Sequence, residues 1–401
     1  MTESTWNLPE PAVLTQVHTS LETQRNDSES PDVLATIVNV EGNAYRRPGA
    51  KMLFDSTGHH IGSLTPGCLE DELQTAAERV RTSGTTEYIR YDMMDDDDVW
   101  GLGVGCHGII DVLVEPLSEA YRPAVSAFLD REDIAVLTVI DETDESASAL
   151  SRGDRVYYYP ADDRFVVPDG AADNWPVAEL KTPAEKMATH GRSTLVTIPP
   201  ADNKNEETAL TVFIDGIAAR PALVIFGSGH DVGPVTELAS KNEFHVTVVG
   251  FRGGVSLADR FPYADETVTT SPRALDDVLA VDDRTYTVVM THNFVDDQLV
   301  VERLLSTETG TPYIGLMGPR ERFERILTAL NDSGVAVSED TLEAVYTPIG
   351  LNLGGGSPYQ IAHSIVAELL AVHNDRTPEH LKSHAGPIHG RVATDILNAD
   401  E

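Results

Sequence analysis

The spacing of hydrophobic positions divides the chain into two regions with different rhythms. Up to about residue 215, short β-branched and apolar runs follow one another with few helical stretches between them, which predicts an α+β sheet domain. The expected strands lie at residues 33–40, 52–54, 86–91, 112–114, 134–140, 156–159, 194–198 and 209–214. Helical spacing is expected over 70–81, 117–129 and 183–189.

After residue 216, apolar runs of strand length alternate with helical stretches. Strands are expected at 222–226, 244–249, 286–291, 313–316 and 346–349, and the main helices at 295–306, 320–330 and 358–373. This alternation predicts a parallel, doubly wound sheet. The fold class is therefore α/β, an N-terminal α+β sheet domain followed by a Rossmann-like domain. No internal repeat is visible in the sequence.

The two ends of the chain are more polar. Residues 1–30 are acidic, and one weakly amphipathic piece predicts a short helix with a loose tail; its apolar positions are Val13, Leu14, Val17 and Leu21. We expect a first domain over 31–215, a Rossmann-like domain over 216–376 and a polar tail over 377–401. The acidic stretch 202–207 is either part of the linker or a hairpin tip within the first domain.

The composition of the chain indicates the environment of the protein more than its activity. The 401 residues carry a formal net charge of −36, and only six of the 29 basic residues are lysine. Because the acids are spread over both halves, we favour adaptation of the whole surface to a salt-rich cytoplasm over binding of a basic partner. The chain has no basic stripe, which argues against binding to nucleic acid. Two distant cysteines, no signal-peptide pattern and no apolar run near about eighteen residues predict a soluble, cytoplasmic protein with no membrane association.

The densest chemical signal is the loop Gly101–Gly108, which contains four glycines and Cys106. Glycines allow the backbone N–H groups to form an anion-binding nest, which favours a thiolate. The other cysteine, Cys68, directly precedes a helical stretch, where unpaired N–H groups also stabilise a thiolate. The alternative for both residues is an inert, buried thiol.

Two adjacent arginines, Arg46 and Arg47, lie in a turn between two expected strands. In a chain this poor in cations, arginines held by a tyrosine, a proline and glycines suit the binding of a phosphate or carboxylate. The alternative is a pair of solvated charges.

The turn Gly227-Ser228-Gly229 follows a strand and opens a helix, as a dinucleotide-binding turn does, and His230 comes next. The fingerprint is incomplete, because Val232 occupies the third glycine position. Gly250 stands where the ribose-binding acid is expected, and Arg252 is close enough in sequence to meet a phosphate. His292 and Asn293 follow a later strand, at the edge where open α/β sheets bind ligands.

These motifs together resemble the XdhC/CoxI family, whose members serve molybdenum hydroxylases such as xanthine dehydrogenase and carbon monoxide dehydrogenase. The resemblance extends over about residues 32–375. In the first domain it is carried by residues 35–38, 41–50, 67–70, 103–108 and 111–116, and in the second by 226–230, 290–294, 315–320 and 348–351.

The resemblance implies an accessory factor that binds the molybdenum cofactor, as molybdopterin or its dinucleotide form. It would assist sulfuration of the cofactor and insert it into an apo-hydroxylase, with a sulfur donor as a further partner and a homodimer as the expected assembly. A soft metal needs thiolates and a phosphate tail needs arginines or helix N-termini. We therefore assign Cys106 and Cys68 to the metal or sulfur end and the other candidates to cofactor binding: Arg46, Arg47, Gly227, Gly229, His230, Arg252, His292 and Asn293.

Two other functions remain open from the sequence. An NAD(P)-dependent oxidoreductase would use the Gly227 turn, with Arg252 as a contact for a 2′-phosphate and NAD(P) as the cofactor. A nucleotide-sensing interaction protein would bind without chemistry. We expect a cofactor-insertion chaperone rather than a catalyst.

Overall fold

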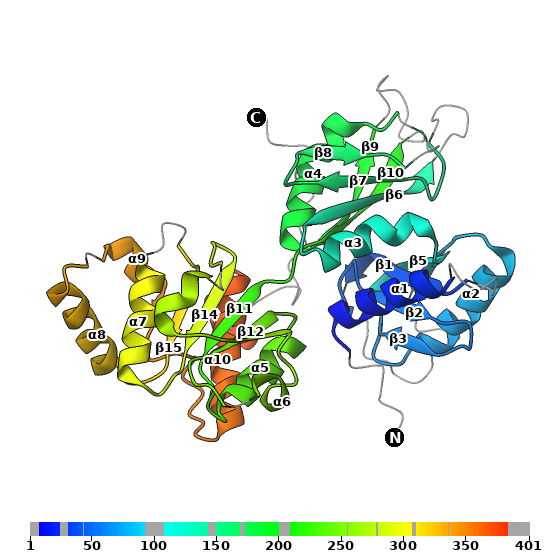
Figure 1. Ribbon diagram of the computed structural model, residues 1–401. Coiled ribbons are helices and arrows are strands. Elements are labelled where there is room, and N and C mark those ends of the chain that lie inside the picture. The colour runs from blue at the N-terminus through cyan, green and yellow to red at the C-terminus, as the bar shows by residue number, and fades with distance from the viewer. Residues whose placement is uncertain are drawn as a thin grey trace. The chain divides into compact units, whose positions relative to one another are not determined.

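The computed structural model describes residues 8–24, 31–42, 44–92, 108–142, 150–168, 172, 174–199, 209–254, 256–277, 280–306, 310–335 and 337–383. The chain forms two compact units that divide between Ala219 and Arg220 (Figure 1). Within the described residues, the strands form two sheets in the first unit and one in the second. None of the helices in these ranges is long and apolar enough to cross a membrane.

The first sheet is antiparallel. Its order is β3 (His60–Gly62), β2 (Lys51–Phe54), β1 (Val33–Gly42), β5 (Gly108–Pro116), β4 (Glu87–Asp92). Helix α2 (Glu70–Ser83) covers one face, because its apolar positions recur at helical spacing and are buried against the sheet: Leu73, Ala76, Ala77 and Val80. The helix ends at Gly84, whose φ of 70° is the left-handed conformation that glycine adopts most easily.

The second sheet is also antiparallel. Its order is β8 (Arg164–Val166), β7 (Arg155–Tyr159), β6 (Ile134–Glu142), β10 (Leu210–Ile217), β9 (Ser193–Ile198). Helix α4 (Val177–His190) packs on it through Leu180, Ala184 and Met187. The helix begins at Val177, so the expectation that it starts at Pro183 is wrong. Proline prefers the first turn of a helix, but here Pro183 lies inside α4, because the turn before it buries Leu180 against the sheet.

The two sheets repeat the same topology, and the expectation of no internal repeat is therefore wrong. Each half runs through three strands, a helix and two strands, and each sheet has the same spatial order. The registers also correspond: Thr36 pairs with Lys51 as Thr138 pairs with Arg155, and Leu34 pairs with Glu115 as Val136 pairs with Asp215. The first unit is thus an internal duplication that sequence identity does not reveal.

The duplicated halves pack through equivalent residues. A small buried cluster joins Val38 and Leu113 of the first sheet to Ile140 and Phe213 of the second. These four side chains occupy matching positions, since Thr36 pairs with Leu113 as Thr138 pairs with Phe213. The contact between the halves therefore has an approximate two-fold character.

Two further helices complete the first unit. Helix α1 (Glu10–Gln24) confirms the expected N-terminal helix, and Leu14, Val17 and Leu21 are buried in one core with residues of α3 (Arg122–Leu129). A short 3₁₀ turn, η2 (Glu119–Tyr121), precedes α3, so the helix expected over 117–129 is divided. Strand β10 continues to Ile217, which places the end of this unit at Ala219.

The second unit has the predicted parallel, doubly wound sheet. Its order is β13 (Glu266–Thr269), β12 (His245–Gly250), β11 (Ala222–Phe226), β14 (Thr285–Val289), β15 (Tyr313–Leu316), β16 (Val345–Tyr346). Counted from β11, this is the 3-2-1-4-5-6 order of dinucleotide-binding folds. The order reverses between β11 and β14, and ligands of such sheets bind at the carboxyl ends of these two strands.

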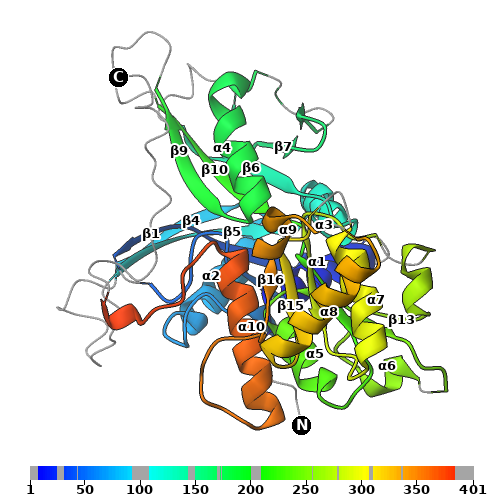
Figure 2. The same cartoon turned by 90° about the vertical axis from the view of Figure 1, so that its left-hand side faces the viewer.

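Helices cover both faces of this sheet. Helices α5 (Val232–Lys241) and α10 (Pro358–His373) share a core with Leu223 and Ile225 of β11. Helices α7 (Phe294–Leu305) and α8 (Arg320–Asp332) share the opposite core with Val224 and Phe226. Figure 2 shows α10 and α8 on opposite sides of β15. The short helices α6 (Leu257–Arg260) and α9 (Glu339–Glu343) lie in connections.

Candidate functional site

The turn after β11 lies tightly against the end of β14. A Cβ atom on Gly227 would come within 2.5 Å of the carbonyl oxygen of Met290, and one on Gly229 within 2.4 Å of Asp231 Oδ1. Gly227 has no room for a side chain, because the atom it would meet belongs to the backbone, whereas a side chain at Gly229 would displace the carboxylate of Asp231. The turn therefore presents bare backbone at the reversal point of the sheet, just before the N-terminus of α5, as the approach of a phosphate requires.

His292 and Asp231 meet beside this turn. His292 follows β14 in the left-handed conformation, with φ of 57°, and its Nε2 lies 2.7 Å from Asp231 Oδ2. A non-glycine residue in this conformation stores strain, which persists in folded proteins mainly at functional positions. The imidazole is 56% exposed, so a ligand at the edge of the sheet can reach it. Asp231, which the sequence analysis missed, orients the ring.

A buried carboxylate holds the loop that carries His292. Asp297, 2% exposed, accepts hydrogen bonds from the backbone N–H and the hydroxyl of Thr291. Its other oxygen lies 2.8 Å from Nε of Arg322 in α8. Asn293 uses its side-chain oxygen to cap α7, accepting from the N–H groups of Val295 and Asp296. Asn293 is thus engaged in positioning the helix.

The other end of the site lies at β12. Gly250 ends this strand, and a Cβ atom there would lie 3.0 Å from Leu257 Cδ1, so α6 covers the place of the expected acid. Arg252 is exposed, as is His230 in the turn. Arg260 Nη1 donates a hydrogen bond of 2.7 Å to the carbonyl of Ser228, between the two glycines of the turn. Arg260 was not predicted from the sequence, where its position soon after the second strand is a weak signal.

In the first unit, Arg46 is already paired. Its Nη2 lies 2.7 Å from Glu10 Oε2, and Glu10 Oε1 accepts the N–H of Lys51 at 2.9 Å. Arg46 thus ties the turn before β2 to the start of α1. A phosphate would have to compete with Glu10 for this guanidinium. Arg47 lies in the same turn and also has an interaction partner.

Cys68 is half-buried against the core beneath α2, two residues before the helix begins. The N–H groups of Cys68 and Leu69 both donate to Thr65 Oγ1 at 3.3 Å, and that of Leu69 also to Glu70. The first turn is acidic, with Glu70, Asp71 and Glu72. These donors are therefore in use, and the helix N-terminus is compensated by carboxylates, which removes the expected support for a thiolate at Cys68.

Cys106 lies outside the described residues, as does most of its glycine-rich loop. Its assignment to the metal or sulfur end stays a prediction. Among the residues that the structure describes, no group of three His, Cys, Asp or Glu side chains could hold a metal ion.

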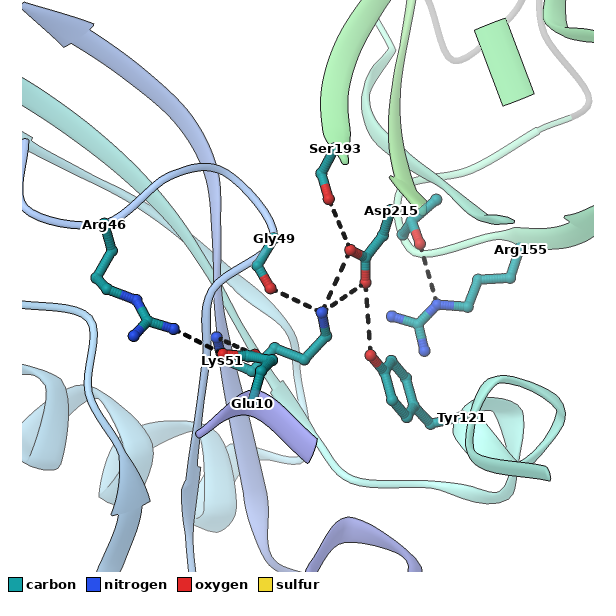
Figure 3. A network of polar contacts seen from close by, with 9 residues as sticks. Glu10, Arg46, Gly49, Lys51, Tyr121, Arg155, Ser193 and Asp215 are labelled. Atoms are coloured by element: carbon teal, nitrogen blue, oxygen red, sulfur yellow. Dashed lines mark hydrogen bonds and ion pairs between the residues drawn. The ribbon is translucent and has the colours of Figure 1, made fainter. Parts of the chain in front are cut away.

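A buried polar network that has no signal in the sequence joins the duplicated halves (Figure 3). Lys51 Nζ lies 2.9 Å from Asp215 Oδ2 and 2.7 Å from the carbonyl of Gly49. Asp215 also accepts the hydroxyl of Ser193 at 2.9 Å and that of Tyr121 at 3.5 Å. At the equivalent positions, Arg155 pairs with Glu115.

The protonation of this network marks it as structural. Burial lowers the pKa of Lys51, but Asp215 together with Tyr121 and Glu10 outweighs burial and raises this pKa well above its ordinary value. Burial raises the pKa of Tyr121, so its hydroxyl stays neutral. Neither Lys51 nor Tyr121 therefore exchanges a proton near neutral pH, as a general acid or base must. The network holds the two halves together instead.

Comparison with known proteins agrees with this two-unit architecture. Residues 27–92 match the XdhC and CoxI family, and residues 223–369 match the XdhC Rossmann domain. A protein of Bacillus subtilis (strain 168), described as a probable subunit of xanthine dehydrogenase, is 32% identical over 356 residues, which make up 88% of this chain and 96% of that protein.

A solved structure is similar over most of the chain. A crystal structure described as a xanthine dehydrogenase from Bacillus halodurans matches with a TM-score of 0.70 and 26% identity, over 92% of this chain and 97% of that one. An uncharacterized protein of Escherichia coli (strain K12), YqeB, is 27% identical over 205 residues, which make up 48% of this chain and 37% of that protein.

Proposed function

Because the chain belongs to the XdhC and CoxI family, we propose that it is an accessory factor for a molybdenum hydroxylase of the xanthine dehydrogenase or carbon monoxide dehydrogenase type. It binds the molybdenum cofactor, assists its sulfuration and inserts it into the apo-enzyme. The observation that carries the proposal is the similarity to the Bacillus subtilis protein, which extends over both units of the chain.

The described residues fit the phosphate end of such a cargo. At the reversal point of the sheet, the side-chain-free backbone of Gly227 and Gly229 precedes helix α5 and lies beside His292. Backbone N–H groups at such a turn receive phosphate oxygens. The Asp231–His292 pair keeps a ring nitrogen oriented at the same edge, where it can donate to an anion when protonated.

For the metal or sulfur end, the chain offers Cys106 and Cys68. A thiolate is a suitable ligand for a soft metal and a suitable carrier of a persulfide sulfur. Since the N–H donors around Cys68 are occupied by Thr65 and Glu70, we assign the larger share of this role to Cys106.

The strand order of the second unit also favours a nucleotide ligand, which keeps an NAD(P)-dependent oxidoreductase as a second candidate. The end of β12 argues against ordinary NAD binding, because Gly250 supplies no carboxylate for the ribose hydroxyls and Leu257 covers its place.

The test is cargo content and its transfer. The full chain is purified from a molybdate-fed host, bound pterin is measured by fluorescence after oxidation, and the protein is then added to an apo-hydroxylase. We expect pterin in near-stoichiometric amount and activation of the hydroxylase. Absence of pterin together with turnover of NADH or NADPH would instead support the oxidoreductase.

A further inference from the structure

The position that binds the ribose hydroxyls in dinucleotide-binding folds differs in this chain. An acid at the end of the second strand ordinarily accepts hydrogen bonds from the ribose hydroxyls. Here that strand ends at Gly250, whose Cα is covered by the side chain of Leu257. Helix α6 thus occupies the space of the acid, and the same helix ends at Arg260.

Arg260 is held firmly and is aimed at the phosphate-binding turn. Leu257 and the next residue, Phe261, are 4% and 1% exposed, so α6 is anchored in the core on both sides of Arg260. Nη1 of Arg260 lies 2.7 Å from the carbonyl oxygen of Ser228. A guanidinium has five N–H donors in a planar fork, and this bond uses one of them.

Two carboxylates, one in the turn and one in α6, could oppose the binding of an anion at Arg260, but one is paired and the other is exposed. Asp231, the carboxylate of the turn, is paired with His292 at 2.7 Å. Asp259, the neighbour of Arg260 in α6, is exposed to solvent, which screens its charge. A planar fork beside a backbone turn matches the oxygens of a phosphate monoester, to which arginine binds in a bidentate manner.

We propose that Arg260 binds a phosphate monoester of the ligand and makes the second unit select phosphorylated over unphosphorylated ligands. Two kinds of ligand carry such a phosphate monoester: a pterin cofactor with a terminal phosphate, and a dinucleotide with a phosphate on its ribose. The first source rests on the proposed function, whereas the second does not. The assignment replaces Arg252 with Arg260 as the phosphate contact.

Two measurements on the full chain distinguish the sources. Calorimetry compares the affinities for NADP⁺ and NAD⁺, which differ by one ribose phosphate. Pterin fluorescence compares the cargo that copurifies from a molybdate-fed host. Both are applied to the wild type, Arg260→Gln, Arg260→Lys and the matched control Arg252→Gln. The ratio of the two nucleotide affinities is internally controlled, because partial misfolding lowers both affinities together.

For a ribose phosphate, we expect NADP⁺ to bind the wild type at least about tenfold more tightly than NAD⁺, with the ratio falling close to one in Arg260→Gln. For a pterin phosphate, we expect pterin content to fall by about tenfold in Arg260→Gln with no preference between nucleotides. In either case Arg260→Lys should retain part of the wild-type nucleotide preference or pterin content, and Arg252→Gln should retain all of it.

The proposal is overturned if Arg260→Gln equals the wild type in both measurements, or if the wild type binds neither pterin nor NADP⁺. Equal weakening of NAD⁺ and NADP⁺ without a change in pterin would assign Arg260 to holding the turn. A wild type that lacks pterin but prefers NADP⁺ through Arg260 would reject the proposed cargo and keep the role of Arg260, so the two failures are distinguishable.

Discussion

Lys51 and Asp215 form an ion pair of 2.9 Å that joins the two halves of the duplicated first unit, and both side chains are at least 95% buried. The pair between Arg155 and Glu115 repeats it in the opposite direction. In each pair the cation begins the second strand of one half and the carboxylate lies on the last strand of the other. This reciprocity is the pattern of an isologous interface, in which each copy contacts the other through the same surface.

The first prediction concerns this ion pair. Lys51→Met leaves Asp215 as a buried carboxylate without its cation, and we expect a loss of about 3–5 kcal/mol in the free energy of unfolding. The double variant Lys51→Met/Asp215→Leu removes both charges and should recover much of that loss. Urea denaturation measures both, with Arg79→Gln as a control because its pair with Glu87 is exposed. A double variant that is no more stable than Lys51→Met would contradict the coupling.

The pair also shows why the duplication escaped sequence analysis. Lysine corresponds to arginine and aspartate to glutamate, so the equivalent positions preserve charge and burial while the residues differ. Gly49 and Gly153 both have positive φ, as do Gly84 and Gly191 after the two helices. A comparison of identical residues does not detect such matches, whereas strand order and register do.

The pattern of apolar residues predicted most of the other strands and helices. In the second unit, continuous apolar runs such as 222–226 are largely buried and predict parallel strands correctly. The short edge strands β8 and β13 were not predicted, because partly exposed edges lack a strong apolar signal. For the site, glycine spacing located the turn at Gly227. Asp231 and Arg260 were missed because their roles arise only from tertiary contacts.

The turn itself provides a steric prediction. Gly227→Ala places a methyl group 2.5 Å from the backbone oxygen of Met290, which cannot swing aside as the end of a flexible side chain would. We expect a lower melting temperature and loss of ligand binding. Gly233→Ala, in α5 with nothing within 4 Å of the new atom, is the control and should be neutral or stabilise by about 0.5–1 kcal/mol. Ligand affinity unchanged in Gly227→Ala would remove the phosphate-binding role of this turn.

His373 predicts a pH dependence of stability. Burial lowers the pKa of His373 below its usual 6.5, and the positive charge of Arg284 lowers it further. The unfolded chain therefore binds a proton that the folded chain does not. The contribution of neutral His373 to the free energy of unfolding is therefore fully present above pH 6.5. It is lost as the pH falls through the pKa of His373 in the folded chain.

The check is a set of melting curves at several pH values for the wild type and His373→Gln. The destabilisation caused by the variant should be largest above pH 7 and shrink on acidification, because only the wild type loses the contribution. A difference that stays constant between about pH 5 and 8 would mean that His373 does not titrate in this window.

The net charge of −36 predicts a salt requirement. Repulsion among carboxylates destabilises the folded chain, and salt at about 3 M screens it over about an ångström or two rather than about ten at 0.1 M. We expect the melting temperature to rise steeply with potassium chloride over this range. A melting temperature that stays flat or falls would leave the charge to be explained by a basic partner.

The last prediction compares the two cysteines. The glycine spacing in the sequence around Cys106 predicts N–H groups that favour a thiolate, whereas at Cys68 two N–H donors are already bonded to Thr65 and the following helix turn is acidic. A serine has nearly the size of cysteine but is a poor ligand for a soft metal. Cys106→Ser should therefore stay folded, copurify with less pterin and fail to activate the hydroxylase, while Cys68→Ser should have a milder effect. If Cys106→Ser keeps its full cofactor content and fully activates the hydroxylase, Cys106 has no role at the metal or sulfur end and its loop is a structural turn. If Cys68→Ser loses more pterin and more activation than Cys106→Ser, the assignment of the two thiols is reversed.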